Sequence, residues 1–167
     1  MDGLESLAGR EYPGRFIIVG RDTLSEHNIV VYGVTGRSPP SRARKFVRDP
    51  KHGVVRTEVT DPKVLEEGSP ALLLYPAVVP LDTAVLVSNG AQTNLLYSAF
   101  KNTEGLAAQS PDVVILKAFV EPVYVYDKKL GWIDLTTFEP DSNKTPRISA
   151  VAGLQQATLH IVRSVGG

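Results

Sequence analysis

The chain has 167 residues, and its 18 basic side chains balance its 18 acidic ones. This length is typical of a single domain, which we expect to span residues 1–167. The charge balance argues against a general nucleic-acid-binding protein, which would carry a basic excess. Because the chain contains no cysteine, disulfides, thiolate nucleophiles and cysteine–zinc sites are excluded.

The first half of the chain is predicted to form short strands joined by turns. A turn at residues 12–14 is followed by expected strands at residues 15–19, 29–34, 45–47, 54–59, 71–79 and 83–87, with one helical turn at residues 61–68. The first two strands are expected to pair as an antiparallel hairpin. The run at 71–79 is apolar enough for a buried strand and is interrupted at Pro76. Residues 36–42 contain Pro39 and Pro40, which exclude a helix interior or a central strand.

The second half begins with a predicted helix at residues 92–101, where Leu95, Leu96 and Phe100 form an apolar stripe. Expected strands follow at residues 113–120, 123–126, 132–137 and 158–162, and residues 147–153 suit either a strand or a tight helix. Many strands in hairpin succession with one clear helix indicate an α+β domain built on antiparallel sheet.

Neither a membrane span nor a leader is indicated. No run of residues approaches the ~20 apolar positions that a spanning helix needs, and residues 1–10 lack the charged start and apolar run of a signal peptide. We therefore expect a cytoplasmic protein that engages neither a membrane nor nucleic acid. The three histidines are far apart in the sequence, so no metal site is expected.

Two polar segments in the first half of the chain are candidate binding elements. Residues 36–42 place Arg37 and Arg42 on a rigid double-proline turn between serines. Guanidinium groups present paired donors that suit a phosphate or a carboxylate, although a solvated turn has the same sequence features. Tyr75 lies in an apolar run, where its ring is either part of the core or carries a functional hydroxyl.

A third polar segment, residues 88–93, leads from a strand through a glycine turn into a helix. Such a junction aims backbone N–H groups and the side chains of Asn89, Gln92 and Thr93 toward one point, an arrangement that binds anions or polar ligand edges. Helix capping alone would explain Asn89 or Thr93, but it explains Gln92 less well.

The last polar segment, residues 138–147, contains Glu139 and Arg147 beside prolines. The residue before a proline is held extended, which fixes the backbone at Glu139. No nucleophile–base pair, glycine-rich phosphate loop or metal-ligand cluster is visible in the sequence. The spacing of these residues alone predicts no more than an α+β domain with an anion site.

Taken together and in this order, the polar segments resemble the IMP cyclohydrolase family of archaeal and bacterial type. The matching motifs are Y-P-G-R at 12–15, G-R-S-x-x-S-R at 36–42, R-T-E-V-x-D-P at 56–62, L-L-Y at 73–75, S-N-G-x-Q-T at 88–93 and F-E-P-D…T-P-R-I-S at 138–149. Their shared order makes the resemblance specific, and it covers most of residues 12–149.

The resemblance implies a cyclohydrolase of purine synthesis, which closes 5-formamidoimidazole-4-carboxamide ribonucleotide (FAICAR) to inosine monophosphate and water. It also implies a fold similar to N-terminal-nucleophile hydrolases, a four-layer αββα sandwich of antiparallel sheets. Family members continue well past the T-P-R-I-S motif, so a C-terminally abbreviated version is expected, and residues 111–135 form a longer strand-rich stretch than the family leads us to expect. The alternative is a non-catalytic purine-nucleotide-binding paralogue, or a structural subunit of the same fold.

Residue roles follow from the same resemblance. Arg42 and Tyr75 match positions implicated in the family's active site, and Glu139 lies in the acidic loop that supplies a carboxylate. We predict that Tyr75 and Glu139 move protons and that Arg42 faces the developing charge. The predicted substrate-binding residues are Arg37, Ser38, Ser41, Asn89, Gln92, Thr93 and Arg147. The implied partner is a small-molecule purine nucleotide with no cofactor, and the open sheet edges of an abbreviated sandwich favour a homo-oligomer.

Overall fold

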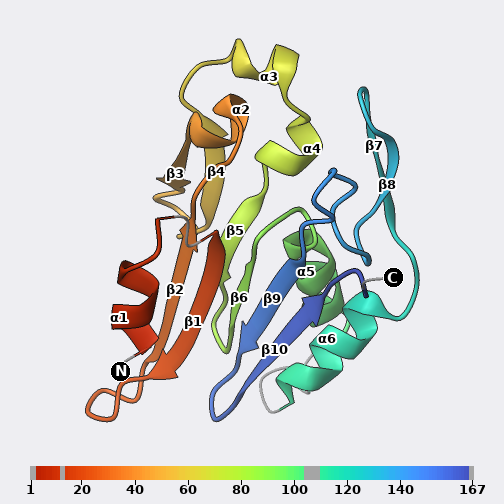
Figure 1. The fold of residues 1–167 in the computed structure, drawn as a ribbon. Coiled ribbons are helices and arrows are strands. Elements are labelled where there is room, and N and C mark those ends of the chain that lie inside the picture. The colour runs from red at the N-terminus through yellow and green to blue at the C-terminus, as the bar shows by residue number, and fades with distance from the viewer. Residues whose placement is uncertain (1–2, 12–13, 104–109, 166–167) are drawn as a thin grey trace.

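The computed structural model describes residues 3–11, 14–103 and 110–165, and it is centred on a six-stranded antiparallel sheet (Figure 1). The strands of this sheet are β3 (Arg44–Arg48), β4 (Val55–Val59), β5 (Pro76–Pro80), β6 (Val85–Ser88), β9 (Arg147–Ala152) and β10 (Ala157–Val162). They lie in the order β10-β9-β6-β5-β4-β3. The turn predicted at residues 12–14 falls largely outside the described residues.

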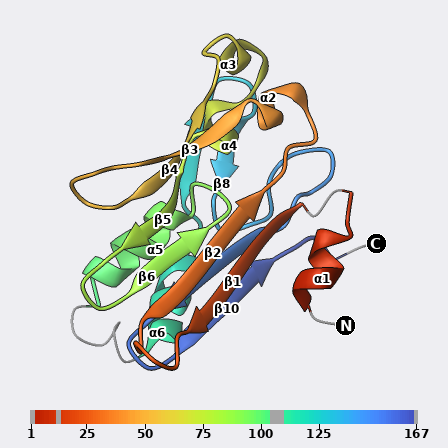
Figure 2. The same cartoon turned by 90° about the vertical axis from the view of Figure 1, so that its left-hand side faces the viewer.

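Two hairpins and a pair of helices complete the framework. β1 (Arg15–Arg21) pairs with β2 (Asn28–Val34), and β7 (Tyr124–Asp127) pairs with β8 (Gly131–Asp134). The β1–β2 hairpin packs on one face of the large sheet, while α5 (Thr93–Lys101) and α6 (Pro111–Phe119) cover the other face. In Figure 2 the hairpin lies in front of the sheet and the two helices lie behind it.

Four shorter helices are also described. α1 (Gly3–Ala8) precedes β1, whereas α2 (Pro39–Arg42), α3 (Val64–Glu67) and α4 (Pro70–Leu73) occupy connections between strands. Among the described helices, none combines the length and apolar character required to cross a bilayer.

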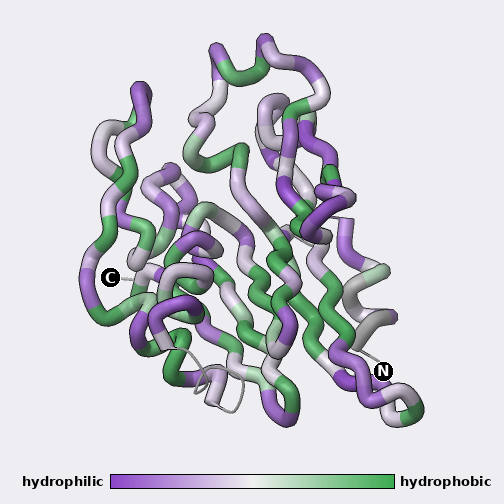
Figure 3. The backbone as a smooth tube through the Cα atoms, turned by 180° about the vertical axis from the view of Figure 1, so that it is seen from behind, coloured by the Kyte–Doolittle hydropathy of each residue, from purple (hydrophilic) through white to green (hydrophobic). Residues whose placement is uncertain are grey.

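The hydrophobic core lies between α5, α6 and the large sheet. Leu86 of β6, Leu96 of α5, Val114 of α6 and Val151 of β9 are fully buried. Figure 3 shows that the strands in the middle of the sheet carry mostly hydrophobic residues. Burying a side chain of this size contributes roughly 1.5–3 kcal/mol, so the core gives the loops at the sheet ends a rigid base.

The predicted α+β class with antiparallel sheets is confirmed. So are the first hairpin, the strands on either side of residue 50, the helical turn before Gly68 and the helix α5. Residues 147–153, for which strand and helix were both open, form β9. The N-terminal-nucleophile-hydrolase-like sandwich remains a prediction.

The strand predicted at residues 113–120 is wrong, because these residues lie mainly in α6. Their β-branched side chains are typical of strands, but Val114, Ile115 and Ala118 share one helical face and are buried. That face packs against β9 and β10. Burial against the sheet outweighs the weak intrinsic preference of valine and isoleucine for strand.

The single strand predicted at residues 71–79 is divided into α4 and β5. The buried Thr57 of β4 accounts for the division: its hydroxyl donates to the carbonyl oxygen of Leu73 at 2.7 Å and accepts from the amide of Tyr75 at 3.0 Å. The amide of Thr57 donates to the carbonyl oxygen of Tyr75, also at 3.0 Å. These bonds fix the backbone that carries Tyr75.

Asp127, at the end of β7, joins the β7–β8 hairpin to the start of α4. Its buried carboxylate accepts from the Ser69 hydroxyl at 2.7 Å, and from the amides of Ala71, Lys129 and Leu130 at 3.3, 2.9 and 3.2 Å. Burial by itself would raise the pKa of Asp127, but these donors outweigh it and hold the pKa below its ordinary value.

We expect Asp127→Asn to lower the free energy of unfolding by about 1–3 kcal/mol at neutral pH, because buried donors lose their acceptor. A carboxyl whose pKa is lowered in the folded state stabilises above its unfolded pKa of about 3.9, and that contribution is lost as pH falls through the folded pKa. Urea unfolding at about pH 7 and about pH 2.5 should therefore show that the difference in unfolding free energy between the wild type and Asp127→Asn becomes smaller in acid. Asp82→Asn, at an exposed carboxylate, is the control. An equal difference in unfolding free energy at both pH values would contradict a stabilising role of the ionised Asp127 carboxylate.

Candidate functional site

A cavity of about 810 Å³ lies where β1 begins, β2 and β6 end, and β9 begins. Its walls are the segment after β2, the connection between α3 and α4, and the loop at residues 139–146. The volume is within the ~300–1,000 Å³ typical of small-molecule sites. Three of the four predicted polar segments contribute residues to this cavity, and the fourth, Tyr75, lies behind it.

A buried ion pair between Arg15 and Glu139 lies at the cavity. Arg15 Nη1 is 2.5 Å from Glu139 Oε1 and also donates to the carbonyl oxygen of Asn89 at 3.3 Å. The side chains of Arg15 and Glu139 are 14% and 2% exposed. Burial would lower the pKa of Arg15, but the charge and hydrogen bond of Glu139 raise it above its ordinary value. The sequence motif contained Arg15, yet nothing in its spacing indicated that Arg15 would meet Glu139.

Arg147 supports this pair from inside the protein. Its Nη1 lies 3.9 Å from Glu139 Oε1 and donates to Gln92 Oε1 at 3.1 Å, and its Nε donates to the Thr137 carbonyl oxygen at 2.7 Å. Burial lowers the pKa of Arg147, an effect that Glu139 opposes and Arg15 reinforces. Arg147 is fully buried and does not line the cavity, so a single carboxylate lies between one guanidinium at the cavity and one beneath it.

The turn between β6 and α5 is held together by its own polar side chains. Asn89 Nδ2 donates to the Pro146 carbonyl oxygen at 2.9 Å, and Asn89 Oδ1 accepts from Gln92 Nε2 and from the Ile148 amide, both at 2.9 Å. The Thr93 hydroxyl donates to the Gly90 carbonyl oxygen at 3.0 Å. Of the three predicted ligand-contacting residues in this turn, Asn89 lines the cavity, whereas Gln92 and Thr93 do not.

Gly90 is required in this turn by close packing. A Cβ atom built on Gly90 would lie 2.5 Å from Gln92 Oε1 and 2.9 Å from Arg147 Nη1. Any larger residue would therefore displace the side chains that support Glu139. The glycine keeps the turn close to the buried arginine.

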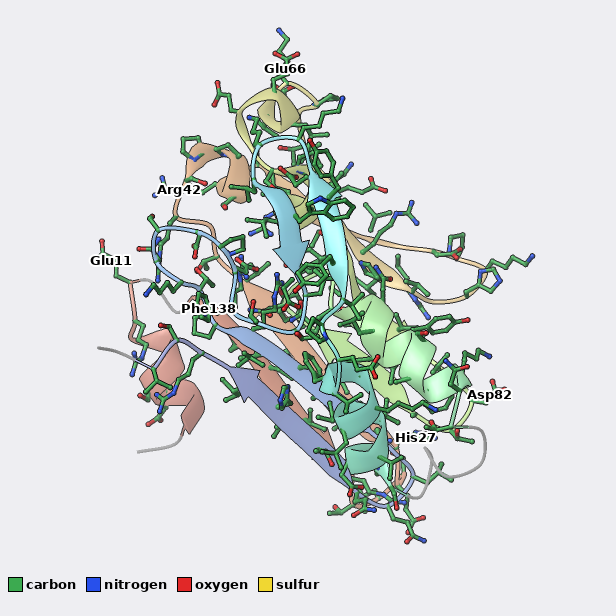
Figure 4. The ribbon with its side chains drawn as sticks, turned by 90° about the vertical axis from the view of Figure 1, so that its right-hand side faces the viewer. Glu11, His27, Arg42, Glu66, Asp82 and Phe138 are labelled. Atoms are coloured by element: carbon green, nitrogen blue, oxygen red, sulfur yellow. The ribbon has the colours of Figure 1, made fainter. Side chains whose placement is uncertain are left out.

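The segment after β2 supplies the cationic wall of the cavity. Arg37, Ser38 and Ser41, three of the predicted substrate-binding residues, line the cavity. The Ser38 hydroxyl accepts from the Ser41 amide at 3.4 Å as the N-cap of α2. Arg42 is exposed, donates through Nε to the Gly36 carbonyl oxygen at 3.2 Å, and points away from the fold in Figure 4. It is not among the cavity-lining residues.

Arg44, which the sequence analysis did not single out, lines the cavity in its place. Its Nε donates to the Ser41 carbonyl oxygen at 2.9 Å, and its Nη1 donates to the Tyr75 hydroxyl at 3.4 Å. Arg42 ends α2 and Arg44 begins β3, so the change from helix to strand decides which arginine faces inward.

Tyr75 lies behind this wall rather than in it. It is buried, and its hydroxyl is 2.8 Å from the hydroxyl of Tyr32 on β2. Burial and the neighbouring Tyr75 raise the pKa of Tyr32 well above its ordinary value, against the opposing charges of Arg15 and Arg44. The two tyrosines thus connect, through Arg44, to the cavity.

The described site combines arginines with a buried, ion-paired carboxylate at one cavity, on an α+β fold with antiparallel sheets. The family model described as IMP cyclohydrolase-like protein matches residues 12–113. The chain therefore belongs to the IMP cyclohydrolase-like family. A search of curated proteins gave no match. Of the site residues, Arg15, Arg37, Arg44 and Tyr75 fall inside the matched range, while Glu139 lies beyond it.

Proposed function

We propose that this cavity binds FAICAR and closes it to inosine monophosphate with release of water. The observation that carries the proposal is the buried Arg15–Glu139 pair, at a cavity with further arginines, in a chain of the IMP cyclohydrolase-like family. An intramolecular ring closure draws much of its rate from holding one reactive rotamer of the substrate. It also needs a site for the phosphate, a donor for the developing oxyanion and a group that moves protons.

In the proposed reaction the carboxamide nitrogen attacks the formyl carbon of the same molecule, which forms the new C–N bond of the ring. The carboxamide nitrogen gives up one of its two protons, and the formyl oxygen becomes a hydroxyl. This hydroxyl then leaves as water, its C–O bond breaking while the formamido nitrogen loses its proton and forms the C=N bond of the ring. Glu139 accepts the proton from the carboxamide nitrogen, with Arg15 fixing its orientation. Arg44, held by the Tyr75 hydroxyl, donates to the oxyanion, and Arg37 with the two serines of α2 holds the phosphate.

The packing of the β1–β2 hairpin on the large sheet supports a related proposal about the fold. In this proposal the fold is an N-terminal-nucleophile-hydrolase-like sandwich whose second sheet is reduced to that hairpin.

The test is direct: purified protein is incubated with FAICAR, and the absorbance of inosine monophosphate is followed. We expect turnover that EDTA does not change, because the groups proposed to bind the substrate and move its protons are all side chains of this chain. Absence of product at micromolar concentrations of folded protein would overturn the proposal.

The second candidate function is binding of a purine nucleotide without turnover. Two observations favour it: Tyr75 does not line the cavity, and the side chains of Asn89 and Gln92 are hydrogen-bonded to each other. Calorimetric titration with inosine monophosphate separates the possibilities, because saturable binding without turnover supports this candidate. A purely structural subunit would bind no nucleotide.

We expect Arg44→Lys to lower the turnover of FAICAR about 10-fold or more, because lysine keeps the charge but loses the paired donors that face the oxyanion. Arg42→Lys, two positions earlier on the exposed end of α2, is the matched control and should leave turnover unchanged. Steady-state kinetics on both variants check this prediction. The opposite pattern would return this role to Arg42.

A further inference from the structure

The outward face of the β7–β8 hairpin carries three exposed aromatic side chains. Tyr124, Tyr126 and Trp132 are 57%, 62% and 71% exposed. Tyr126 and Trp132 are directly opposite in the strand register, and their rings meet edge to face at 5.4 Å between centroids. The opposite face of the hairpin packs inward, where Ile133 is buried in the core. The inner face of the hairpin is therefore packed on the core, while its aromatic face is exposed to solvent.

The proposed function leaves this face unused. No residue of β7 or β8 lines the cavity, and the hairpin lies beyond residues 12–113, which match the family. Contiguous exposed apolar patches on a soluble protein mark interaction surfaces, and tyrosine and tryptophan are enriched at protein interfaces.

The charges around the aromatic face have an unequal distribution along the hairpin. Glu121 and Asp134 lie at its base, and Lys128 and Lys129 lie at its tip, where Lys129 Nζ donates to the carbonyl oxygen of Glu66 in α3. Two such hairpins packed face to face in opposite directions place the basic tip of each beside the acidic base of the other. A two-fold axis generates this arrangement, because an isologous contact uses the same patch on both copies. The surface is thus complementary in charge to itself.

The exposed apolar area is also of the right order for a dimer. Aromatic side chains bring roughly 150–250 Å² each, so the exposed parts of three provide on the order of 400 Å², about half of the ~800 Å² that a stable interface buries per partner. Leu116 of the helix α6 and its C-cap residue Val120 are also exposed. Figure 4 looks onto the side of the molecule where α6 and the hairpin both lie, so the helix can extend the contact.

We propose that two copies of this chain associate through the aromatic faces of their β7–β8 hairpins, related by a two-fold axis. Tyr126 and Trp132 form the centre of the contact, and Lys128 of each copy lies beside Glu121 of the other. The occupant of the face is a second copy of the chain, independently of what the cavity binds.

Sedimentation equilibrium of the full chain tests this proposal. We expect a species of twice the 18.1 kDa chain mass at tens of micromolar, which dissociates on dilution. Trp132→Ser should raise the dimer dissociation constant at least about 30-fold, as expected for a central aromatic residue of an interface. Leu24→Ser, at an exposed apolar residue between β1 and β2, is the control and should leave the constant unchanged. Far-ultraviolet circular dichroism verifies that each variant is folded.

A charge exchange tests the orientation of the two hairpins. Lys128→Glu and Glu121→Lys should each weaken the dimer, and the double variant should restore it, because the opposed charges are then exchanged. A wild-type chain that stays monomeric at about 100 μM, well above the Kd of a stable dimer, would overturn the proposal. So would an assembly that is insensitive to Trp132→Ser, or a double variant no tighter than either single one.

Discussion

Glu139→Gln is expected to lower the free energy of unfolding by about 3–5 kcal/mol, the scale of breaking a buried ion pair by removing one partner. Glutamine has nearly the same shape but no charge, so Arg15 and the fully buried Arg147 would lose the carboxylate that they share. Urea unfolding at neutral pH measures the change.

Glu67→Gln is the matched control for this prediction, because Glu67 also lines the cavity but is exposed. Its effect should remain within about 0.5 kcal/mol. Adding Arg147→Met to Glu139→Gln removes one of the stranded charges, so the double variant should lose less stability than the sum of the single changes. Equal effects at Glu139 and Glu67 would mean that the buried pair contributes little.

Tyr75→Phe is expected to reduce the turnover of FAICAR about 10²-fold or more, the scale of losing one transition-state donor or its support. Phenylalanine fills the same space but releases Arg44 and Tyr32 from the shared hydroxyl. The unfolding free energy should fall by only about 1 kcal/mol, the value of one hydrogen bond. Steady-state kinetics should show a fall in kcat with a smaller change in KM, because Tyr75 does not line the cavity.

Tyr97→Phe, on the exposed side of α5, is the control for the loss of a phenolic hydroxyl and should leave turnover unchanged. A fully active Tyr75→Phe with reduced stability would assign Tyr75 to the core alone. The two readings predicted for this tyrosine are thus separated by one substitution.

The polar turn between β6 and α5 shows how far local sequence reasoning reached. A strand, a glycine turn and a helix were predicted there, and all three are present. The side chains of Asn89 and Gln92 could be expected to converge, and they do, but on each other and on the chain at Pro146 and Ile148. Residue types indicate that polar groups will gather; they do not indicate whether a ligand or the protein itself satisfies them.

The arginines illustrate the same limit. Arg42 and Arg44 are equally basic and two positions apart, and the sequence favoured the one inside the motif. In the structure α2 ends at Arg42 and β3 begins at Arg44, so the second arginine faces the cavity. The direction of a side chain depends on the residue at which the helical repeat ends and the strand repeat begins. Such boundaries are the least certain part of a sequence-based prediction.

The sequence by itself determined the antiparallel α+β class, the first hairpin, the helix α5 and the family, because these depend on local periodicity, turn residues and motifs in a fixed order. Only the tertiary structure decided that residues 113–120 are largely helical, since their apolar face is buried by β9 and β10. It also decided that Arg15 meets Glu139, 124 residues later in the chain. The partner of a buried charge is set by the topology that brings distant segments together. The spacing of residues within either segment does not reveal which distant residue it will contact.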